Sequence, residues 1–325
     1  MIRYSFIIPV KAINDYIHEA VPKILQIERD DYEIIIYPDR ANDESWRKTR
    51  QIATGHCGPA EKRTRAIHDA LGEILIFVDD DAYPEKDFLD HLEEDFRDLG
   101  ITAVGGPAIT PKHDSFWQKV SGAVFLSFLS GGSPERYVSV GKKRLVDDWP
   151  SVNLSIRKDA FIALNGFDCE FWPGEDTKLC LDIIKKIKGK ILYDPALIVY
   201  HHRREGLWRH MKQVAGYGLH RGFFAKRYPA TSLRWKYFLP TFFFLFVSFG
   251  TVAVLLDRDF LIWYLALWSL YFVGLLKSAV DIYRYEQNIA IISHALYYIF
   301  FTHLAYGFSF LRGFLWTWKL KSKLR

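Results

Sequence analysis

The chain has 325 residues, of which 50% are hydrophobic and 16% aromatic, with 43 Lys and Arg against 38 Asp and Glu. This length suits one large domain or two of ordinary size, and a net charge of +5 is too small to indicate nucleic-acid binding. Cys57, Cys169 and Cys180 are odd in number and lack the spacing of a metal site, which favours a reducing compartment. No cleavable signal peptide is expected, because Met1–Tyr4 leads directly into a strand-like run.

Strand-like and helix-like segments alternate over the first 80 residues. The predicted strands are 4–10, 33–37 and 74–78. The predicted helices are 13–25, interrupted at Pro22, and 59–71, begun by a proline and capped by Gly72. The polar residues 40–58 between them are predicted to form a loop with a short helix or strand. The alternation predicts right-handed crossovers and a mostly parallel sheet.

The central strand, Ile74–Val78, runs directly into Asp79, Asp80 and Asp81. Five apolar residues in a row favour a strand that is covered on both faces, and ligands bind at the carboxyl ends of such strands. Three adjacent carboxylates repel one another unless a cation lies between them. Asp79 and Asp81 offer the hard oxygen ligands that Mg2+ or Mn2+ prefers. A solvated acidic turn or a helix N-terminus is the alternative.

The next hundred residues continue the α/β pattern. The predicted elements are a helix at 88–99, a strand at 102–107 that leaves the sheet, a strand at 151–157 followed by a helix to 164, a helix at 177–188, and short strands at 191–193 and 197–200. An apolar block at 116–129 could line a membrane-facing groove or pack on the sheet. Glu175 and Asp176 stand just before a predicted helix, where acidic residues are ordinary caps but where a general base could also lie.

The stretch 203–236 is basic, with nine Lys or Arg and one acid, Glu205, among interleaved apolar residues. This pattern predicts an amphipathic helix on an anionic membrane surface. A nucleic-acid groove is the alternative, and the hydrophobic segments that follow argue against it.

Three hydrophobic segments follow, at about 238–256, 260–276 and 289–311. All three are uncharged. The first two are close to the length that spans hydrocarbon, whereas the third is less hydrophobic and contains His294, His303 and Gly307. The basic stretch places the N-terminal domain in the cytosol by the positive-inside rule. Three full spans would put the basic tail outside. Either the third segment is re-entrant or interfacial, or the rule fails, and we favour a cytosolic tail.

Over residues 1 to about 205 the order of elements resembles the family 2 glycosyltransferases of the GT-A fold. The resemblance rests on short motifs in the family's order, namely Ile7–Val10, Lys62-Arg63, the DxD-like Asp79–Asp81, Asn153–Lys158 with Gly166–Asp168, and the ED-like Glu175-Asp176. It implies an α/β fold with a Rossmann-like mixed sheet at 1–205. The charge and hydropathy patterns predict a basic membrane-interface region at 206–236 and a transmembrane region at 237–325. Together they predict a multi-pass protein of the cell membrane whose catalytic domain faces the cytosol.

The resemblance further implies roles for individual residues. Asp176 would be the catalytic base with Glu175 beside it, and Asp79 with Asp81 would hold Mn2+ or Mg2+. Trp149 and Asn153 would shape the acceptor side. The residues implied to bind the nucleotide sugar are Pro9, Val10, Asp39, which would read the base, Lys62, Arg63, Asp79, Asp80, His202, Arg203 and Arg204. For His202, a surface histidine at a strand end is the alternative.

The implied activity is inverting, metal-dependent transfer of a sugar from a UDP- or GDP-linked donor to a membrane-associated acceptor. A lipid-linked saccharide fits best as acceptor, in cell-surface glycan biosynthesis. Gln213–Tyr217 lacks the Arg-Trp of the processive synthases, and Ala82–Pro84 differs from the Leu-Gln-His of the dolichyl-phosphate sugar synthases. Two alternatives remain open: a polyprenyl-phosphate glycosyltransferase, and a non-catalytic membrane scaffold or nucleotide-sugar sensor.

Overall fold

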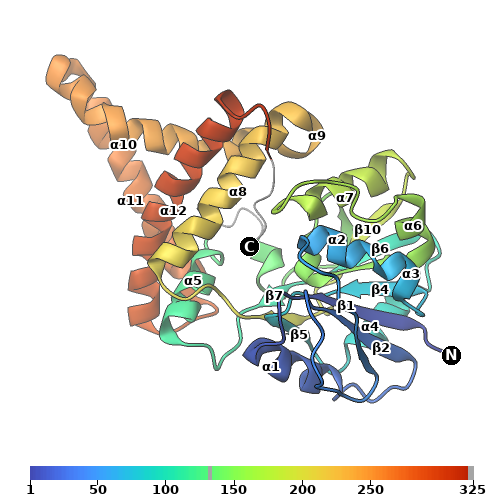
Figure 1. Ribbon diagram of the computed structural model, residues 1–325. Coiled ribbons are helices and arrows are strands. Elements are labelled where there is room, and N and C mark those ends of the chain that lie inside the picture. The colour runs from blue at the N-terminus through green and yellow to red at the C-terminus, as the bar shows by residue number, and fades with distance from the viewer. Residues whose placement is uncertain (131–133, 321–325) are drawn as a thin grey trace. The chain divides into compact units, whose positions relative to one another are not determined.

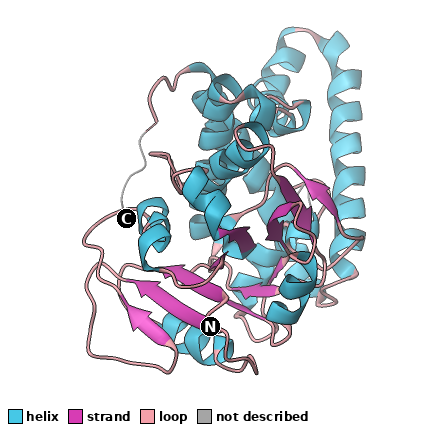
Figure 2. Ribbon diagram, turned by 90° about the vertical axis from the view of Figure 1, so that its right-hand side faces the viewer, coloured by secondary structure: helices cyan, strands magenta, loops and turns pink. Residues whose placement is uncertain are grey.

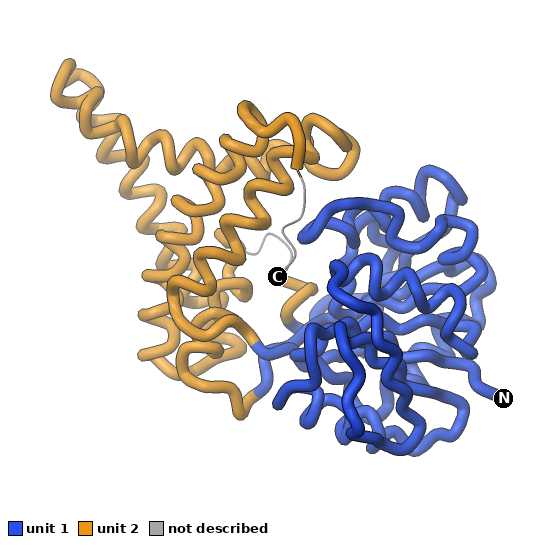
Figure 3. The backbone as a smooth tube through the Cα atoms, in the orientation of Figure 1, with its two compact units in different colours: residues 1–111, 138–202, 321–325 blue, residues 112–137, 203–320 orange. Residues whose placement is uncertain are grey.

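The computed structural model describes residues 1–130 and 134–320, which form two compact units (Figure 3). The first unit comprises residues 1–111 and 138–202, and the second comprises 112–137 and 203–320. The segment 112–137 therefore leaves the first unit and returns to it.

The first unit is built on an eight-stranded mixed sheet (Figure 1). Its strands lie in the order β3 (Thr49–Gln51), β2 (Tyr32–Tyr37), β1 (Tyr4–Pro9), β4 (Ile74–Phe77), β9 (Leu154–Arg157), β6 (Ile101–Gly105), β10 (Lys190–Tyr193) and β8 (Arg144–Val146). All pairs are parallel except those made by β9 and β8. The predicted mostly parallel sheet is confirmed.

Helices cover both faces of this sheet. Alternate residues of β1 and β4 enter two separate cores, because successive side chains of a strand point to opposite faces. Phe6 and Ile76 pack with α1 (Asp15–Ile24) and α4 (Phe88–Asp95). Ile7 and Phe77 pack with the other group of helices, α2 (Pro59–Thr64), α3 (Ala66–Asp69), α6 (Lys158–Ala163) and α7 (Glu175–Lys185). This double covering explains the continuous apolar runs of the strands.

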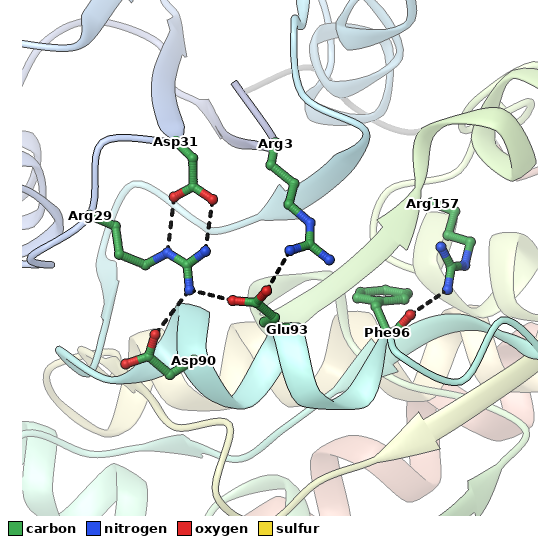
Figure 4. A network of polar contacts seen from close by, with 7 residues as sticks. All are labelled: Arg3, Arg29, Asp31, Asp90, Glu93, Phe96 and Arg157. Atoms are coloured by element: carbon green, nitrogen blue, oxygen red, sulfur yellow. Dashed lines mark hydrogen bonds and ion pairs between the residues drawn. The ribbon is translucent and has the colours of Figure 1, made fainter. Parts of the chain in front are cut away.

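A network of arginines ties α4 to the end of the sheet opposite the Asp triplet (Figure 4). Arg29 donates to Asp31, Asp90 and Glu93, and Arg3 also donates to Glu93 at 2.6 Å. A carboxylate that accepts hydrogen bonds from two guanidiniums is stabilised in its charged form, and these bonds from Arg29 and Arg3 lower the pKa of Glu93. The network therefore holds α4 on the sheet, at the end opposite the Asp triplet.

A small second sheet joins β5 (Ala82–Pro84), β11 (Val199–His201) and β7 (Ala108–Ile109). β11 pairs antiparallel with β5, so that His201 lies opposite Ala82. This pairing brings the end of the first unit's chain to the Asp triplet.

Several predicted helix features differ in the structure. Pro22 lies inside the last turns of α1 without interrupting it. The helix predicted at 59–71 is split at Arg65 and ends at Asp69, so Gly72 is not its cap. Gly72 instead packs on β1, where an added Cβ would lie 2.7 Å from the carbonyl carbon of Tyr4. The close approach of two backbones, rather than helix termination, requires glycine there.

Two further expectations were wrong. The strand predicted to leave the sheet at 102–107 is β6, which lies inside the sheet between β9 and β10. The apolar block at 116–129 does not pack on the sheet. It forms α5 (Phe116–Val124), whose Val120 and Val124 are buried with helices of the second unit. Periodicity shows that such a face is buried but not against which partner.

The second unit is built of helices and their connecting turns, with no strand among its described residues (Figure 2). Its main helices are α5, α8 (Leu207–Arg227), α9 (Pro229–Ser232), α10 (Leu239–Leu256), α11 (Leu261–Tyr283) and α12 (Ile289–Leu315), and short 3-10 turns at Trp235–Tyr237 and Arg258–Phe260 precede α10 and α11. Three of these segments, Trp235–Leu256, Arg258–Tyr283 and Ile289–Leu315, are long and apolar enough to cross a membrane. They support membrane association.

Candidate active site

The Asp triplet lies at the carboxyl end of β4, where a turn leads into β5. The backbone N–H of Ala82 donates to the carbonyl of Asp79 at 3.1 Å and closes this turn. Asp79 and Asp80 are half-buried, whereas Asp81 is only 4% exposed. The three carboxylates are therefore held at different depths.

Asp79, Asp81 and His201 form a candidate metal site. One ligand atom of each residue lies within 4.8 Å of the others, and Nε2 of His201 is 3.2 Å from Oδ1 of Asp81. Two carboxylates and an imidazole form a chemically suitable donor set for a divalent transition metal such as Mn2+. Sequence reasoning missed His201, because only the pairing of β11 with β5 brings it to the triplet.

Asp80 is engaged differently from its two neighbours. Its Oδ2 accepts a hydrogen bond of 2.8 Å from Nδ2 of Asn14, and Oδ1 of Asn14 caps α1 by accepting from the N–H of Ile17 at 3.0 Å. Asp80 therefore links the triplet to the start of α1.

Arg63 joins the triplet to the ED pair. Its Nη1 donates to Oε1 of Glu175 at 3.0 Å, and its Nη2 donates to Oδ1 of Asp79. Arg63 is 2% exposed, and the central carbon of its guanidinium lies 5.7 Å from the ring centre of Phe167. A buried arginine is thus shared by two carboxylates from distant parts of the chain.

Glu175 and Asp176 form the first turn of α7, two residues earlier than the predicted start of this helix. Glu175 is 4% exposed, and its burial, together with the charge of Asp176, raises the pKa of its carboxyl although Arg63 opposes this shift. Asp176 is half-buried, and its two oxygens accept from the N–H groups of Thr177 at 2.7 Å and Ser151 at 3.4 Å. Of the pair, Asp176 is the more accessible carboxylate.

Asp39, Lys62 and the end of β1 form a second polar group at the same edge of the sheet. Lys62 is 3% exposed; it pairs with Asp39 and donates to the carbonyls of Val10 at 2.6 Å and Tyr37 at 3.3 Å. Nδ1 of His56 lies 3.2 Å from the other oxygen of Asp39. Burial alone would raise the pKa of Asp39, but the hydrogen bonds from Lys62 and His56 outweigh it and lower this pKa.

The two residues predicted for the acceptor side are buried. Trp149 is 1% exposed, its ring packs 4.9 Å from that of Tyr193, and its Nε1 donates to the carbonyl of Gly106 at 2.9 Å. Nδ2 of Asn153 donates to the carbonyls of Pro107 at 3.0 Å and Leu197 at 2.7 Å. Both side chains hold neighbouring loops together, and their role toward an acceptor stays a prediction.

His202 is 6% exposed and is therefore not a surface histidine. Its backbone N–H donates to the carbonyl of Asp81 at 3.0 Å, and its Nε2 lies 3.0 Å from Oε2 of Glu19. Arg203 and Arg204 belong to the second unit, where Arg203 lies 5.2 Å from the ring centre of Tyr137. The nucleotide-binding roles of these three residues stay predictions.

Residues 5–161 match the family model described as Glycosyl transferase family 2. The chain thus carries a family 2 glycosyltransferase domain and is a transferase. Among solved structures, the mannosyltransferase PcManGT from Pyrobaculum calidifontis, in complex with GDP-Man and Mn2+, aligns with a TM-score of 0.57 at 16% identity. The alignment covers 98% of this chain and 88% of that one, which confirms the predicted GT-A fold.

Curated relatives are distant. A dolichyl N-acetyl-alpha-D-glucosaminyl phosphate 3-beta-D-2,3-diacetamido-2,3-dideoxy-beta-D-glucuronosyltransferase of Methanococcus voltae is 23% identical over 234 residues, 67% of this chain and 70% of the relative. The pre-mycofactocin glycosyltransferase of Mycobacterium tuberculosis is 27% identical over 172 residues, 53% of this chain and 36% of the relative. The poly(ribitol-phosphate) beta-N-acetylglucosaminyltransferase TarS of Staphylococcus aureus is 24% identical over 129 residues, 34% of this chain and 22% of its own length.

Proposed function

We propose that this protein is an inverting, metal-dependent glycosyltransferase that moves a sugar from a nucleoside-diphosphate sugar to a membrane-associated acceptor. The observation that carries the proposal is the network in which Arg63 contacts both Asp79 and Glu175. It joins a carboxylate of the candidate metal site to the acidic pair that would supply the base.

The donor would bind across the ends of β1, β2 and β4. Asp39 would accept from an N–H of the uracil or guanine, and Lys62 would hold Asp39 and the backbone of Val10 in place. Pro9 and Val10, which end and follow β1, would form the floor beneath the nucleotide. When bound by Asp79, Asp81 and His201, Mn2+ or Mg2+ would supply positive charge against the diphosphate leaving group.

Asp176 would act as the general base. It is the more accessible carboxylate of the ED pair, and an acceptor hydroxyl that loses its proton to Asp176 could attack the anomeric carbon from the face opposite the leaving group. A single displacement of this kind inverts the anomeric centre. Glu175, fixed by Arg63, would position the start of α7.

Other residues would complete the donor side. Asp80 would keep the triplet fixed to α1 through Asn14. His202 would hold the backbone of Asp81, and Arg203 and Arg204 would close over the diphosphate when the donor is bound.

A lipid-linked saccharide is the acceptor we favour. The name of the Methanococcus voltae relative describes transfer to a sugar that is carried on dolichyl phosphate, and this chain has apolar helices that support membrane association. We further propose a multi-pass protein of the cell membrane, with its catalytic unit in the cytosol, that acts in cell-surface glycan biosynthesis. The alternative, a polyprenyl-phosphate glycosyltransferase, would use a bare lipid phosphate instead of a sugar hydroxyl.

The test uses the detergent-solubilised full chain and a panel of UDP-, GDP- and other activated sugars, each with Mn2+, with Mg2+ or with a chelator. We expect slow release of nucleotide from one donor only, and only with metal. The active donor is then offered with a short polyprenyl phosphate or the corresponding polyprenyl-linked saccharide, and the anomeric configuration of the product is determined by NMR.

Transfer to the saccharide with inversion supports the proposal, and transfer to the bare phosphate establishes the alternative. Nucleotide release that is unchanged by the chelator would rule out the metal. If no donor of the panel releases its nucleotide and no metal-dependent nucleotide binding is detected, the alternative of a non-catalytic membrane scaffold is favoured.

A further inference from the structure

Asp39, the residue proposed to contact the nucleobase, has its two carboxylate oxygens held by different partners. Oδ1 pairs with Nζ of Lys62 on α2, and Oδ2 lies 3.2 Å from Nδ1 of His56. Although burial alone would raise it, the pKa of Asp39 is lowered by the hydrogen bonds from Lys62 and His56, so Asp39 is an ionised carboxylate that only accepts hydrogen bonds. His56 belongs to none of the motifs that carry the family resemblance, so its place beside Asp39 requires a separate explanation.

Lys62 engages the inner oxygen of this carboxylate. Its Nζ donates to the carbonyls of Val10 at 2.6 Å and Tyr37 at 3.3 Å, and also to Oδ1 of Asp39. An ammonium group has three hydrogens, so these three acceptors use all of them. Because Lys62 is buried, the oxygen that it contacts points towards the interior of the unit. Lys62 therefore positions Asp39 and has no hydrogen left for a nucleotide.

His56 engages the outer oxygen. Since an ionised carboxylate cannot donate, the hydrogen of this contact is on Nδ1 of His56 and points to Oδ2 of Asp39. The side chain of His56 is 59% exposed, so the contact lies at the surface of the unit. The outer oxygen of Asp39 thus has a hydrogen-bond donor directly beside it.

The loop that carries His56 is fixed by its backbone. The N–H of Thr54 donates to the carbonyl of Pro38 at 2.9 Å. The N–H of Gly55 donates to the carbonyl of Asp39 at 3.0 Å. Gly55 has a φ of 71°, in the left-handed region that favours glycine, and the chain turns there directly before His56. The position of His56 is therefore set by backbone bonds as well as by its contact with the carboxylate.

This arrangement of one outward acceptor beside one donor matches uracil better than the other bases. Uracil has a single ring N–H between two carbonyls, so its N–H can donate to Oδ2 of Asp39 while a carbonyl accepts from Nδ1–H of His56. Guanine presents two adjacent donors, its ring N–H and its amine, to a place with one outward oxygen. Cytosine presents a lone pair where Oδ2 requires a donor. Polar groups that a wrong base leaves unpaired are a strong source of specificity.

We propose that His56 is a base-specificity residue that, together with Asp39, selects uracil, so that the donor is a UDP-sugar. This inference rests on the proposed function, because it requires that Asp39 receives the base of a nucleoside-diphosphate sugar. It names the class of donor that the proposed function leaves open between UDP- and GDP-sugars. Asp39 and His56 contact the base, whereas Lys62 acts only through Asp39 and is a positioning residue.

The test measures binding of UDP, GDP and CDP to the detergent-solubilised full chain with Mn2+ by isothermal titration calorimetry. His56→Phe keeps a flat ring but removes the donor, and His56→Asn keeps a side-chain N–H near the position of Nδ1. His91→Phe on α4 is the matched control, because it also removes a histidine that lies 3.3 Å from an aspartate, Asp87. Mn2+ binding without nucleotide and Tm are measured for every variant, so that a structural effect is recognised.

We expect the natural protein to bind UDP at least about tenfold more tightly than GDP or CDP, the effect of one hydrogen bond. His56→Phe should bind UDP more weakly and lose most of the preference over GDP, because Oδ2 can then accept the second donor of guanine. Its Mn2+ binding and Tm should be unchanged. His56→Asn should keep most of the preference, and His91→Phe all of it.

Binding of GDP by the natural protein as tightly as UDP would overturn the selection of uracil. An unchanged UDP-to-GDP preference in His56→Phe would overturn the role of His56. In both cases metal-dependent nucleotide binding remains, so the proposed function stands. If none of the three nucleotides binds in the presence of Mn2+, the proposed function fails and this inference fails with it.

Discussion

Arg63 donates a hydrogen bond of 3.0 Å from its guanidinium to the carboxylate of Glu175, which lies 112 residues further along the chain. The bond connects α2 to the first turn of α7. Since the same guanidinium contacts Asp79, it makes a carboxylate of the Asp triplet and a carboxylate of the ED pair parts of one network.

Replacement of Arg63 by Met should destabilise the protein strongly. It would leave the buried Glu175 and the half-buried Asp79 without their cation, and loss of one partner of a buried ion pair typically lowers the free energy of unfolding by about 3–5 kcal/mol. Thermal unfolding in detergent measures this as a lower Tm. Arg97→Met, at an exposed position of the same unit, is the control and should change little. Equal Tm values for the two variants would contradict the central position of Arg63.

Asp176→Asn should abolish transfer and leave nucleotide binding intact. An amide cannot accept the proton of the acceptor hydroxyl, and removal of a general base typically lowers the rate about 10²–10⁴-fold. Turnover of the active donor and binding of its nucleotide are measured separately. Asp90→Asn on the exposed surface of α4 is the control. Normal turnover by Asp176→Asn would end its assignment as the base.

Within the Asp triplet, we expect the three carboxylates to differ. Asp79→Asn and Asp81→Asn should lose metal-dependent nucleotide binding, because each removes an anionic ligand of the candidate site. Asp80→Asn should retain it, since the amide oxygen can still accept from Asn14. Titration with Mn2+ followed by electron paramagnetic resonance reports metal binding directly. Equal losses in all three variants would mean that the triplet acts only through its total charge.

His201→Ala tests the candidate metal ligand that the sequence did not reveal. We expect metal affinity to fall by more than the 10–100-fold that loss of an outer partner brings, since Nε2 of His201 lies within the ligand set. Unchanged Mn2+ affinity would reduce the site to the two aspartates.

Asp95 should make stability depend on pH in the acid range. Burial raises the pKa of Asp95 to about 6; Lys143, 2.7 Å away, opposes the shift, and the charge of Asp194 adds to it. Between the unfolded pKa of about 3.9 and about 6, the folded state binds more protons than the unfolded state, so this contribution to stability is lost as pH rises through that window.

The comparison for this effect is Asp95→Asn, which cannot ionise. The Tm of the natural protein relative to Asp95→Asn should fall between pH 4 and pH 6 and level off above. Lys143→Met removes the opposing cation and should move the fall to higher pH. A Tm difference that is independent of pH would contradict the raised pKa.

Gly222 and Gly216 of α8 should respond oppositely to alanine. A Cβ at Gly222 would lie 2.1 Å from the carbonyl oxygen of Phe310, whereas nothing described lies within 4 Å of a Cβ at Gly216. Gly222→Ala should therefore separate α8 from α12 and lower Tm. Gly216→Ala should raise stability by about 0.5–1 kcal/mol, the usual gain in a helix interior. A lower Tm for both variants would contradict the assigned contact.

Local sequence patterns predicted much of the fold and part of the candidate site of this protein. The apolar runs of β1, β2 and β4 predict buried strands, because each run has both faces to cover. The rule that ligands bind at the carboxyl ends of such strands predicts a site at the Asp triplet after β4. The order of short motifs predicted the family and the fold, and the uncharged stretches predicted the apolar helices that support membrane association.

What the sequence could not determine are contacts between residues that are distant along the chain. His201 joins Asp79 and Asp81 only because β11 pairs with β5, and no spacing in the sequence encodes that register. The helices that cover α12 were likewise not predictable, since length and hydropathy describe a helix by itself, whereas burial against α5 and α8 is a property of the packed unit.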